Sequence, residues 1–346
     1  VGGVIMSVGS PTEVAAKIND LQRHAKHPLL VTADLETGAG FRMFGAMYMP
    51  GPIELGGATN FPSLMALGAS GDTALAYEMG RITAQEARAV GIHVAFGPVL
   101  DVNNNSDNPI INVRSFGEDP ARVGALGAAM VRGTQEHGAI ATGKHFPGHG
   151  DTGEDSHLAL PTIAVSRERM DSVELPPFRD AIAAGMGAIM TAHITVPSIN
   201  GGTGDAATLS PRVLTGLLRD ELGFRGIVFT DAMDMAAISG RLGSGEAAVR
   251  AVLAGADVIL MPASVEQAAK GLVDAVRSGR ISAERLDASV LLLLRTKESL
   301  GLHREREVAL ERVHAVVGIP ANQQVADSIA RRSVTVLRNG RDLLPL

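Results

Sequence analysis

The chain has 346 residues, of which 45% are hydrophobic and 20% charged, and it contains no cysteine. This composition is typical of a globular protein with one main domain, and it excludes disulfides, thiolate metal sites and cysteine nucleophiles. The formal charge of −6 is spread along the chain without a basic run, and no apolar stretch is long enough to cross a bilayer. We therefore expect a soluble protein without a nucleic-acid partner or a membrane span. The compartment, cytoplasmic or exported, and the oligomeric state stay open.

Short β-branched or apolar segments alternate with helical patterns along the chain. They comprise residues 3–7, 29–33, 93–96, 140–143, 188–192, 227–230 and 257–261. This alternation predicts a parallel sheet with helical crossovers. We expect an α/β fold of the (β/α)8 TIM-barrel type, incomplete at the N-terminus, with the eighth strand before Val1. An open doubly wound sheet is the alternative.

Later segments define helices and a domain boundary. Ser210 and Pro211 form a helix start before the run VLTGLLRDEL, and Gly223 ends it. Residues 284–300 form an amphipathic helix. We expect a catalytic barrel over residues 1–303, a linker over 304–325 and the beginning of a second α/β domain over 326–346, with a strand and turn in residues 333–340.

Polar residues fall just past several of the predicted strands. They are Asp34, Asp101, Lys144 with His145, His193 and Asp231. The carboxyl ends of parallel strands share one face of a barrel, and active sites of barrel enzymes lie on that face. The sequence therefore predicts an active site built from these loops.

The segment from Gly143 to His157 reads GKHFPGHGDTGEDSH and concentrates titratable groups at the end of an apolar run. Asp155 and His157 are two residues apart, so in an extended loop both side chains project to the same side. The carboxylate would then hold the imidazole and stabilise its protonated form for proton transfer. The alternative is that Asp155 caps a helix beside an incidental histidine.

Two ligand-binding patterns in the chain are incomplete. Residues 138–144 match most of a phosphate-binding loop, but His145 stands where a hydroxyl is required. Residues 101–105 resemble the start of a calcium loop, but Ser106 replaces the glycine of the turn. We expect these asparagines to cap turns instead.

A zinc site made of His145, His149 and His157 is also disfavoured. The spacings match no usual ligand pattern, and the ammonium of Lys144 would repel a divalent cation. We expect no metal and no organic cofactor.

Asp231 ends the run Ile227 to Thr230 and is therefore held by a rigid strand. A nucleophile or charge stabiliser needs such an anchor. An N-cap role is the alternative. Asp234 is expected to be a solvated or capping group.

Together these residues resemble the bacterial β-N-acetylglucosaminidases of glycoside hydrolase family 3. The most specific element is KHFPGHGDTGEDSH, residues 144–157. Supporting elements are GPVLDVNNNSDNPIINVRSFGEDP, residues 97–120, and GFRGIVFTDAMDM, residues 223–235. The tail, residues 333–346, looks like the start of the α/β sandwich that follows the barrel in two-domain members.

The resemblance implies a role for each matching residue. Asp231 would be the nucleophile, His157 the general acid/base and Asp155 its orienting partner. The substrate-binding residues would be Asp34, Arg42, Arg114, Lys144 and His145. One departure lies after Asp34, where Glu36-Thr37-Gly38-Ala39-Gly40-Phe41-Arg42 replaces an acidic residue, two glycines and an arginine, so the assignment of Arg42 is the weakest.

The expected activity is a retaining exo-glycosidase that removes terminal β-linked N-acetylglucosamine from short oligosaccharides or muropeptides. A phosphorylase remains an alternative, because a histidine acid/base leaves less negative charge against inorganic phosphate. A β-glucosidase or β-xylosidase of the same family, and an inactive sugar-binding module, are the others. Aromatic residues are only 3% of the chain, so we expect a pocket for a single sugar instead of a platform for long chains.

Overall fold

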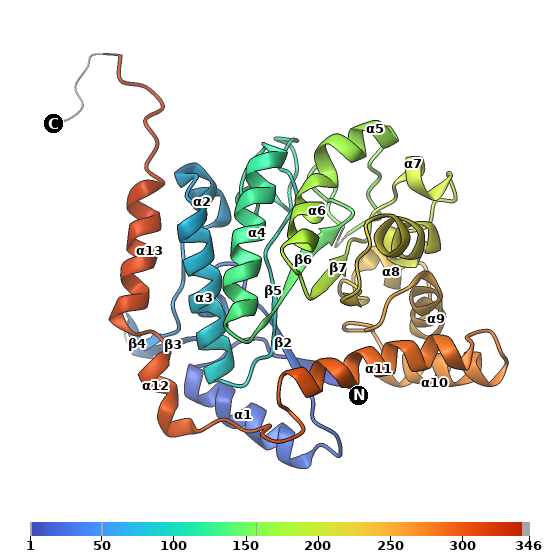
Figure 1. Ribbon diagram of the computed structural model, residues 1–346, viewed down its shortest axis with the longest axis horizontal. Coiled ribbons are helices and arrows are strands. Elements are labelled where there is room, and N and C mark those ends of the chain that lie inside the picture. Colours follow the sequence, from blue (N-terminus) through green and yellow to red (C-terminus); the bar gives the residue numbers. More distant parts are fainter. Residues whose placement is uncertain (1, 50, 157, 341–346) are drawn as a thin grey trace.

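The computed structural model describes residues 2–49, 51–156 and 158–340, and its centre is a parallel sheet (Figure 1). Within these residues the sheet holds six strands in the order β1-β2-β5-β6-β7-β8, and every neighbouring pair is parallel. The strands are β1 (Gly3–Ile5), β2 (Leu30–Asp34), β5 (Val94–Phe96), β6 (Ile140–Phe146), β7 (Ala188–Thr191) and β8 (Ile227–Phe229).

The sheet curls around its own apolar interior. Phe96 on β5 and Phe229 on β8 are separated by two strands, yet their ring centroids are 5.2 Å apart and the rings meet edge to face. Neighbouring strands lie ~4.8 Å apart, so in a flat sheet these positions would be roughly 14 Å apart. The contact requires curvature, and the predicted TIM-barrel-like α/β fold is confirmed.

One predicted strand is wrong. Residues 257–261 make only an isolated bridge, between Val258 and Phe229. Two residues further on, the N–H of Leu260 donates to the side-chain hydroxyl of Thr230 at 2.9 Å. A side chain thus takes the place of the backbone ladder, and the strand does not continue. The predicted strand before Val1 remains a prediction.

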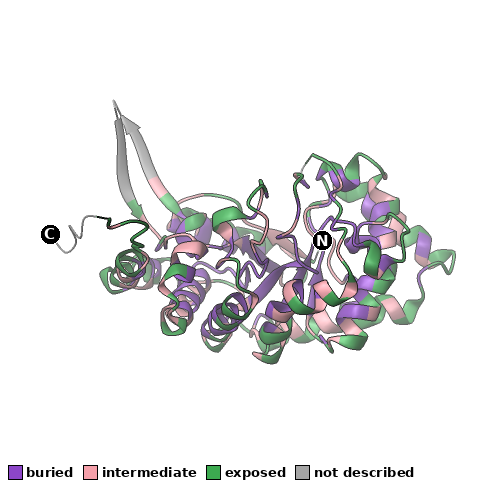
Figure 2. Cartoon of the chain, turned by 90° about the horizontal axis from the view of Figure 1, so that it is seen from above, coloured by how far each residue is buried: buried purple, intermediate pink, exposed green. Residues whose placement is uncertain are grey.

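Helices cover the outside of the sheet, with their buried faces turned inward (Figure 2). The helix predicted after Pro211 is present as a π-helix, and Gly223 after it has φ +71°. Its first turn is bonded to the backbone carbonyl of Ser210, without a side-chain cap. No helix in the described ranges is long and apolar enough to cross a membrane. The principal helices are α1 (Pro11–His24), α3 (Thr73–Ala89), α4 (Pro120–Glu136), α6 (Pro176–Ala183), the π-helix (Arg212–Glu221), α9 (Ser244–Ala254), α10 (Val265–Arg277) and α11 (Ala283–Ser299).

An antiparallel hairpin after β2 was not predicted. Strands β3 (Phe44–Met49) and β4 (Gly51–Gly57) pair with each other outside the main sheet, and the short helix α2 (Leu64–Ser70) follows. Glycines and prolines are typical of loops, so the composition of this segment concealed a two-stranded unit.

Residues 304–325, predicted as a linker, contain ordered structure that packs on the barrel. Val313 in α12 (Val313–Val316) and Val317 belong to the buried cluster formed by α1 and the neighbouring strands. Ala326 and Ile329 in α13 (Pro320–Arg332) belong to the cluster formed by α2, α3 and α4. The proposed boundary between the domains stays a prediction.

A carboxylate fastens this C-terminal segment to the barrel. Glu86 on α3 is fully buried and accepts hydrogen bonds from the backbone N–H and the hydroxyl of Thr59 at 2.8 and 2.7 Å. The N–H of Gly318 and the side-chain amide of Asn322 also donate to it, each at 2.9 Å. Glu86 therefore joins the loop after the hairpin to the start of α13.

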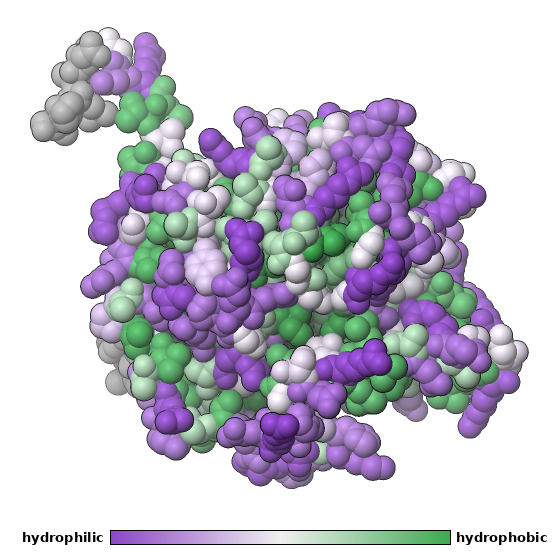
Figure 3. Space-filling model, in the orientation of Figure 1, coloured by the Kyte–Doolittle hydropathy of each residue, from purple (hydrophilic) through white to green (hydrophobic). Residues whose placement is uncertain are grey.

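The strand predicted for residues 333–340 is not formed. After α13 the chain runs away from the body of the molecule (Figure 3), and Val334 and Leu337 are 78% and 93% exposed. A strand needs a neighbouring strand to accept and donate its ladder bonds, and residues 333–340 pair with no strand among the described residues. Residues 341–346, the rest of the predicted second domain, lie outside them.

Candidate active site

A cavity of 590 Å³ opens at the carboxyl ends of the strands. Six of the eight residues predicted to act on or bind substrate line it, although they are distant in the sequence. They are Asp34, Arg42, Arg114, Lys144, His145 and Asp231. The cavity therefore lies at the edge of the sheet where the sequence predicted a cluster of polar groups.

The floor of the cavity is a network of buried ion pairs. Lys144, whose side chain is 3% exposed, places Nζ 2.9 Å from an oxygen of Asp34 and 2.7 Å from an oxygen of Glu36. Burial alone would lower the pKa of Lys144, but the two carboxylates outweigh it and raise the pKa above its ordinary value. Lys144 is thus held as a cation at neutral pH.

Arg114 completes this network on the side of Glu36. Its Nε and Nη2 donate to the two oxygens of Glu36 at 2.9 and 2.7 Å, a bidentate geometry. Burial raises the pKa of Glu36, but Lys144 and Arg114 outweigh it and lower the pKa well below the usual carboxyl range. Burial lowers the pKa of Arg114, but the carboxylate of Glu36, followed by those of Asp101 and Asp231, outweighs it and raises the pKa.

Arg42, the weakest assignment from the sequence, does belong to this cavity. Its Nη2 lies 2.8 Å from the second carboxylate oxygen of Asp34. Burial raises the pKa of Asp34, but Lys144, followed by Arg42, lowers it below the ordinary value. The altered sequence after Asp34 therefore still brings an arginine to the site.

An irregularity in β6 brings two consecutive side chains to the same cavity. In a regular strand Lys144 and His145 would point to opposite faces. The pairing of β6 with β7 shifts register between Gly143 and Phe146, and both residues line the cavity. Such irregularities re-aim side chains at the rims of barrels.

Asp101 orients His145 from below. Its Oδ2 lies 2.7 Å from Nδ1 of His145, and its Oδ1 accepts the backbone N–H of His149 at 2.7 Å. Arg114 can only donate, so Nε2 of His145, 3.3 Å from Arg114 Nη2, is the acceptor and Nδ1 carries the proton. Burial raises the pKa of Asp101, but His145 outweighs it and the pKa is lowered.

The loop after β6 is held by His149. Its Nδ1 lies 2.9 Å from the hydroxyl of Thr152 and its Nε2 3.0 Å from the hydroxyl of Ser156. Burial lowers the pKa of His149 to about 4, so it is neutral near pH 7 and is a structural group. No cluster of metal-binding side chains is found in the part of the chain that the structure describes.

Of the asparagines in residues 101–105, Asn105 caps a turn as predicted, whereas the side-chain oxygens of Asn103 and Asn104 are buried without a hydrogen-bond partner among the described residues. The side-chain oxygen of Asn105 accepts the N–H of Asp107 at 2.9 Å, and that of Asn108 accepts the N–H of Ile111 at 2.9 Å. The amide of Asn108 also donates to the carbonyls of His149 and Gly150, at 2.8 and 2.9 Å. It thereby ties this segment to the loop after β6.

Asp231 lies two residues after β8 and is half-buried in the cavity wall. One carboxylate oxygen accepts the N–H of Ala232 at 2.8 Å. The carbonyl of Ala232 in turn accepts a hydrogen bond from Nε2 of the fully buried His193 at 3.0 Å. His193, whose position after a strand was noted from the sequence, therefore fixes the backbone that carries Asp231.

The two remaining predicted residues, Asp155 and His157, are two positions apart in the sequence. His157 lies outside the described residues. Asp155 is not part of the cavity wall, and its backbone carbonyl accepts the N–H groups of Leu158 and Ala159, each at 3.0 Å. Ser156, between them, does line the cavity. The pairing of Asp155 with His157 stays a prediction.

Sequence reasoning did not assign Glu36, Asp101 or His149 to the site. Glu36 and Asp101 neutralise and orient the predicted substrate-binding residues, and His149 shapes the loop. Two features of the sequence could have pointed to these residues: Asp101 follows a strand, and Glu36 is an acidic residue two positions after Asp34. Neither reveals its partner, because the partners come from other strands.

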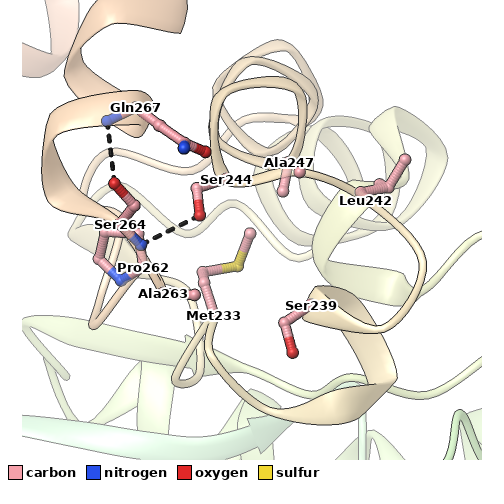
Figure 4. A pocket seen from close by; sticks show the side chains of 10 residues that line it. Met233, Ser239, Leu242, Ser244, Ala247, Pro262, Ala263, Ser264 and Gln267 are labelled. Atoms are coloured by element: carbon pink, nitrogen blue, oxygen red, sulfur yellow. Dashed lines mark hydrogen bonds between the residues drawn. The ribbon is translucent and has the colours of Figure 1, made fainter.

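A smaller cavity of 190 Å³ near the starts of α9 and α10 lacks acid/base chemistry (Figure 4). The N–H of Ser264 donates to the hydroxyl of Ser244 at 3.1 Å, and the hydroxyl of Ser264 accepts the N–H of Gln267 at 3.2 Å. Met233 and other apolar or uncharged residues form the rest of its wall. Without a titratable side chain, this cavity does not compete as the reaction site.

Comparison with known proteins places the chain in a family. Residues 1–296 match the model of the glycosyl hydrolase family 3 N-terminal domain. The chain therefore belongs to glycoside hydrolase family 3, as its motifs indicated.

Named relatives agree with this family. A "Beta-N-acetylglucosaminidase/beta-glucosidase" of Cellulomonas fimi is 35% identical, over 100% of this chain and 61% of the relative. The solved structure of a family 3 β-N-acetylglucosaminidase from Paenibacillus sp. str. FPU-7 is similar with a TM-score of 0.89 and 45% identity, over 98% of this chain and 64% of that one. A structure named "Beta-glucoside phosphorylase BglX" has a TM-score of 0.90 and 28% identity, over 100% and 62%. The chain thus spans less than two thirds of the length of these relatives.

Proposed function

We propose that this chain carries the catalytic centre of a retaining exo-glycosidase that removes terminal β-linked N-acetylglucosamine from short oligosaccharides or muropeptides. The observation that carries the proposal is the shared cavity of Asp231, Ser156 and the charged floor. The proposal assigns the acid/base to His157, the next residue in the sequence after Ser156. The names of the relatives support N-acetylglucosamine as the sugar that is removed.

The reaction has two steps in this proposal. The carboxylate of Asp231 attacks the anomeric carbon and forms a glycosyl ester, while His157 donates its proton to the departing oxygen. His157 then accepts a proton from water, and the resulting hydroxide attacks the anomeric carbon and releases Asp231. Asp155 stabilises the protonated imidazole of His157.

The charged floor binds the hydroxyl groups of the terminal sugar. The cations Lys144 and Arg114 donate, and the carboxylate of Asp34, which is 24% exposed, accepts. Because each charge already has a partner of opposite sign, the groups stay fixed when the cavity is empty. Such preorganisation leaves little reorientation to the binding step.

Phosphorolysis is the second candidate, favoured by the resemblance to the named β-glucoside phosphorylase. In that reaction inorganic phosphate attacks the glycosyl ester of Asp231 in place of water. A histidine acid/base, unlike a carboxylate, places no negative charge against the incoming phosphate.

The test compares nitrophenyl β-N-acetylglucosaminide with the matching glucoside and xyloside, with and without phosphate. We expect the N-acetylglucosaminide to be preferred and the free sugar to be the product, and Asp231→Ala to abolish turnover. Preference for the glucoside would assign the chain to the β-glucosidase alternative, and a sugar 1-phosphate would establish phosphorolysis. Sugar binding without any turnover would leave only the inactive binding module.

A further inference from the structure

Three exposed apolar side chains from different loops border the candidate active-site cavity. Phe41 is 39% exposed, Val113 51% and Met261 44%. Lys144 and Glu36, which line the same cavity, are charged and buried. Isolated exposed apolar residues are common on protein surfaces, so the relevant observation is that each of these is fixed in place.

Phe41 is held by a stacked cation. It ends the helical turn Ala39–Phe41, and the guanidinium carbon of Arg42 lies 4.8 Å from the centroid of its ring. Arg42 is itself bonded to Asp34 on the cavity floor. A guanidinium over an aromatic face is attractive, so the ring is tied to the floor through Arg42.

Val113 is held at the tip of a turn. It stands between Asn112, which has φ +41°, and Arg114, which is anchored on Glu36. The N–H of Arg114 donates to the carbonyl of Ile111 at 2.8 Å and closes the turn. Arg114 reaches inward while its neighbour stays at the mouth of the same cavity.

Met261 has φ +43°, a left-handed conformation that is uncommon for a residue other than glycine. The preceding residue is fixed on both sides. The N–H of Leu260 donates to the hydroxyl of Thr230, and its carbonyl accepts the N–H of Met233, both at 2.9 Å. Such a conformation persists where neighbours determine it, and it is concentrated at functional sites.

We propose that Phe41, Val113 and Met261 form a subsite for the leaving group, and that it selects leaving groups presenting an apolar ring face. The inference rests on the proposed function. An exo-acting enzyme buries the terminal sugar on the polar floor, so the bond to be cleaved points to the cavity mouth and the leaving group meets the apolar rim. An aryl ring and the C–H face of a second sugar offer the same chemistry.

The test compares 2-phenylethyl and ethyl β-N-acetylglucosaminides. Both release a primary alcohol and make a similar demand on the acid, so they differ mainly in apolar contact. We expect kcat/KM to be ~10-fold higher for the phenylethyl glycoside. In Phe41→Ala, Val113→Ala and Met261→Ala this ratio falls toward one, whereas Phe41→Leu retains most of it. Because both substrates are measured on one preparation, any loss of folded enzyme cancels.

Val265→Ala is the matched control, since Val265 is 56% exposed on α10 and does not line the cavity. A ratio near one in the unmodified chain, or one that the three rim substitutions leave intact, overturns the subsite while hydrolysis itself is preserved. Failure to cleave any N-acetylglucosaminide, including the nitrophenyl one, overturns the proposed function and the subsite with it. A second comparison, of N,N′-diacetylchitobiose with the ethyl glycoside, shows whether the subsite binds a sugar ring as well as an aryl ring. If the ratio of the two kcat/KM values falls in the rim variants, the subsite binds a sugar ring. If the ratio does not change, the subsite is restricted to aryl groups.

Discussion

Lys144 and Glu36 form a buried ion pair, with Nζ 2.7 Å from Oε1 and the two side chains 3% and 6% exposed. The pair joins β6 to the loop after β2, so it links two separate segments of the cavity floor. Its partners Asp34 and Arg114 extend it into a network of alternating charges. Removal of one member takes a partner from each of its neighbours, which makes the network testable through stability as well as activity.

Lys144→Met should destabilise the fold. The substitution preserves an unbranched side chain but leaves Asp34 and Glu36 without their shared cation. Breaking a buried pair from one side costs ~3–5 kcal/mol. Urea unfolding should show this loss, and Lys270→Met, on an exposed i,i+4 pair with Asp274, should change the free energy by less than ~1 kcal/mol. Equal effects for the two variants would contradict a cooperative buried network.

The free energy of unfolding should decrease at acidic pH. The pKa values of Asp34 and Glu36 are lowered by folding, so their contribution is present above the ordinary carboxyl pKa and is lost as pH falls through the lowered values. We expect the free energy of unfolding to decrease below about pH 4, with a slope of up to ~1.4 kcal/mol per pH unit for each group.

The control for this pH dependence is Asp34→Asn measured beside Asp220→Asn, because Asp220 is an exposed residue of the π-helix. The first should flatten the slope and the second should leave it. A slope that Asp34→Asn does not alter would show that other carboxylates carry the acid sensitivity.

Gly150→Ala should disrupt the loop after β6. A Cβ at this position would lie 1.7 Å from the backbone oxygen of Val102, so one of two packed segments must move. Overpacking of this kind costs ~1–3 kcal/mol. Gly153→Ala in the same loop is the matched control, because its Cβ would meet nothing within 4 Å. Gly150→Ala should have a lower unfolding temperature and slower turnover than Gly153→Ala. Similar values for the two variants would indicate that the loop rearranges at little cost.

Glu86→Gln should loosen the start of α13. The amide retains only one acceptor oxygen, so its NH₂ group opposes either the N–H of Thr59 at the Oε2 position or the three donors from Thr59, Gly318 and Asn322 at the Oε1 position. An unsatisfied buried group costs ~1–3 kcal/mol. Glu78→Gln, on the same helix but paired at the surface with Arg81, should have a small effect. Hydrogen exchange should show faster opening near residues 318–322 in Glu86→Gln alone, and unchanged protection there would refute the proposed tie.

His157→Asn should make turnover depend on the leaving group. Without the acid, substrates that release an alcohol should slow by ~10²–10⁴-fold, whereas a dinitrophenyl glycoside needs no protonation and should be cleaved at a comparable first-step rate. Burst kinetics with both substrates measure this, and His27→Asn at an exposed site is the control. A uniform loss for all leaving groups would assign His157 a role other than proton donor.

The sequence by itself determined the architecture and indicated which polar residues line the candidate site. Strand segments such as Leu30–Asp34 and Ile140–Phe146 were predictable because β-branched and apolar runs bounded by polar residues are a local signal. The order of these runs with intervening helices defined the barrel class, and polar residues after strands identified the active face. The segment beginning at Lys144 also pointed to the family.

Only the tertiary structure decided which charges become partners. Glu36, Lys144 and Arg114 meet because separate strands end at one edge of the curled sheet, and no local pattern encodes that distance. The register shift in β6 and the left-handed backbone at Met261 likewise depend on contacts with other segments. Periodicity reports how one segment folds, whereas the electrostatics of the site arise between segments that the sequence holds far apart.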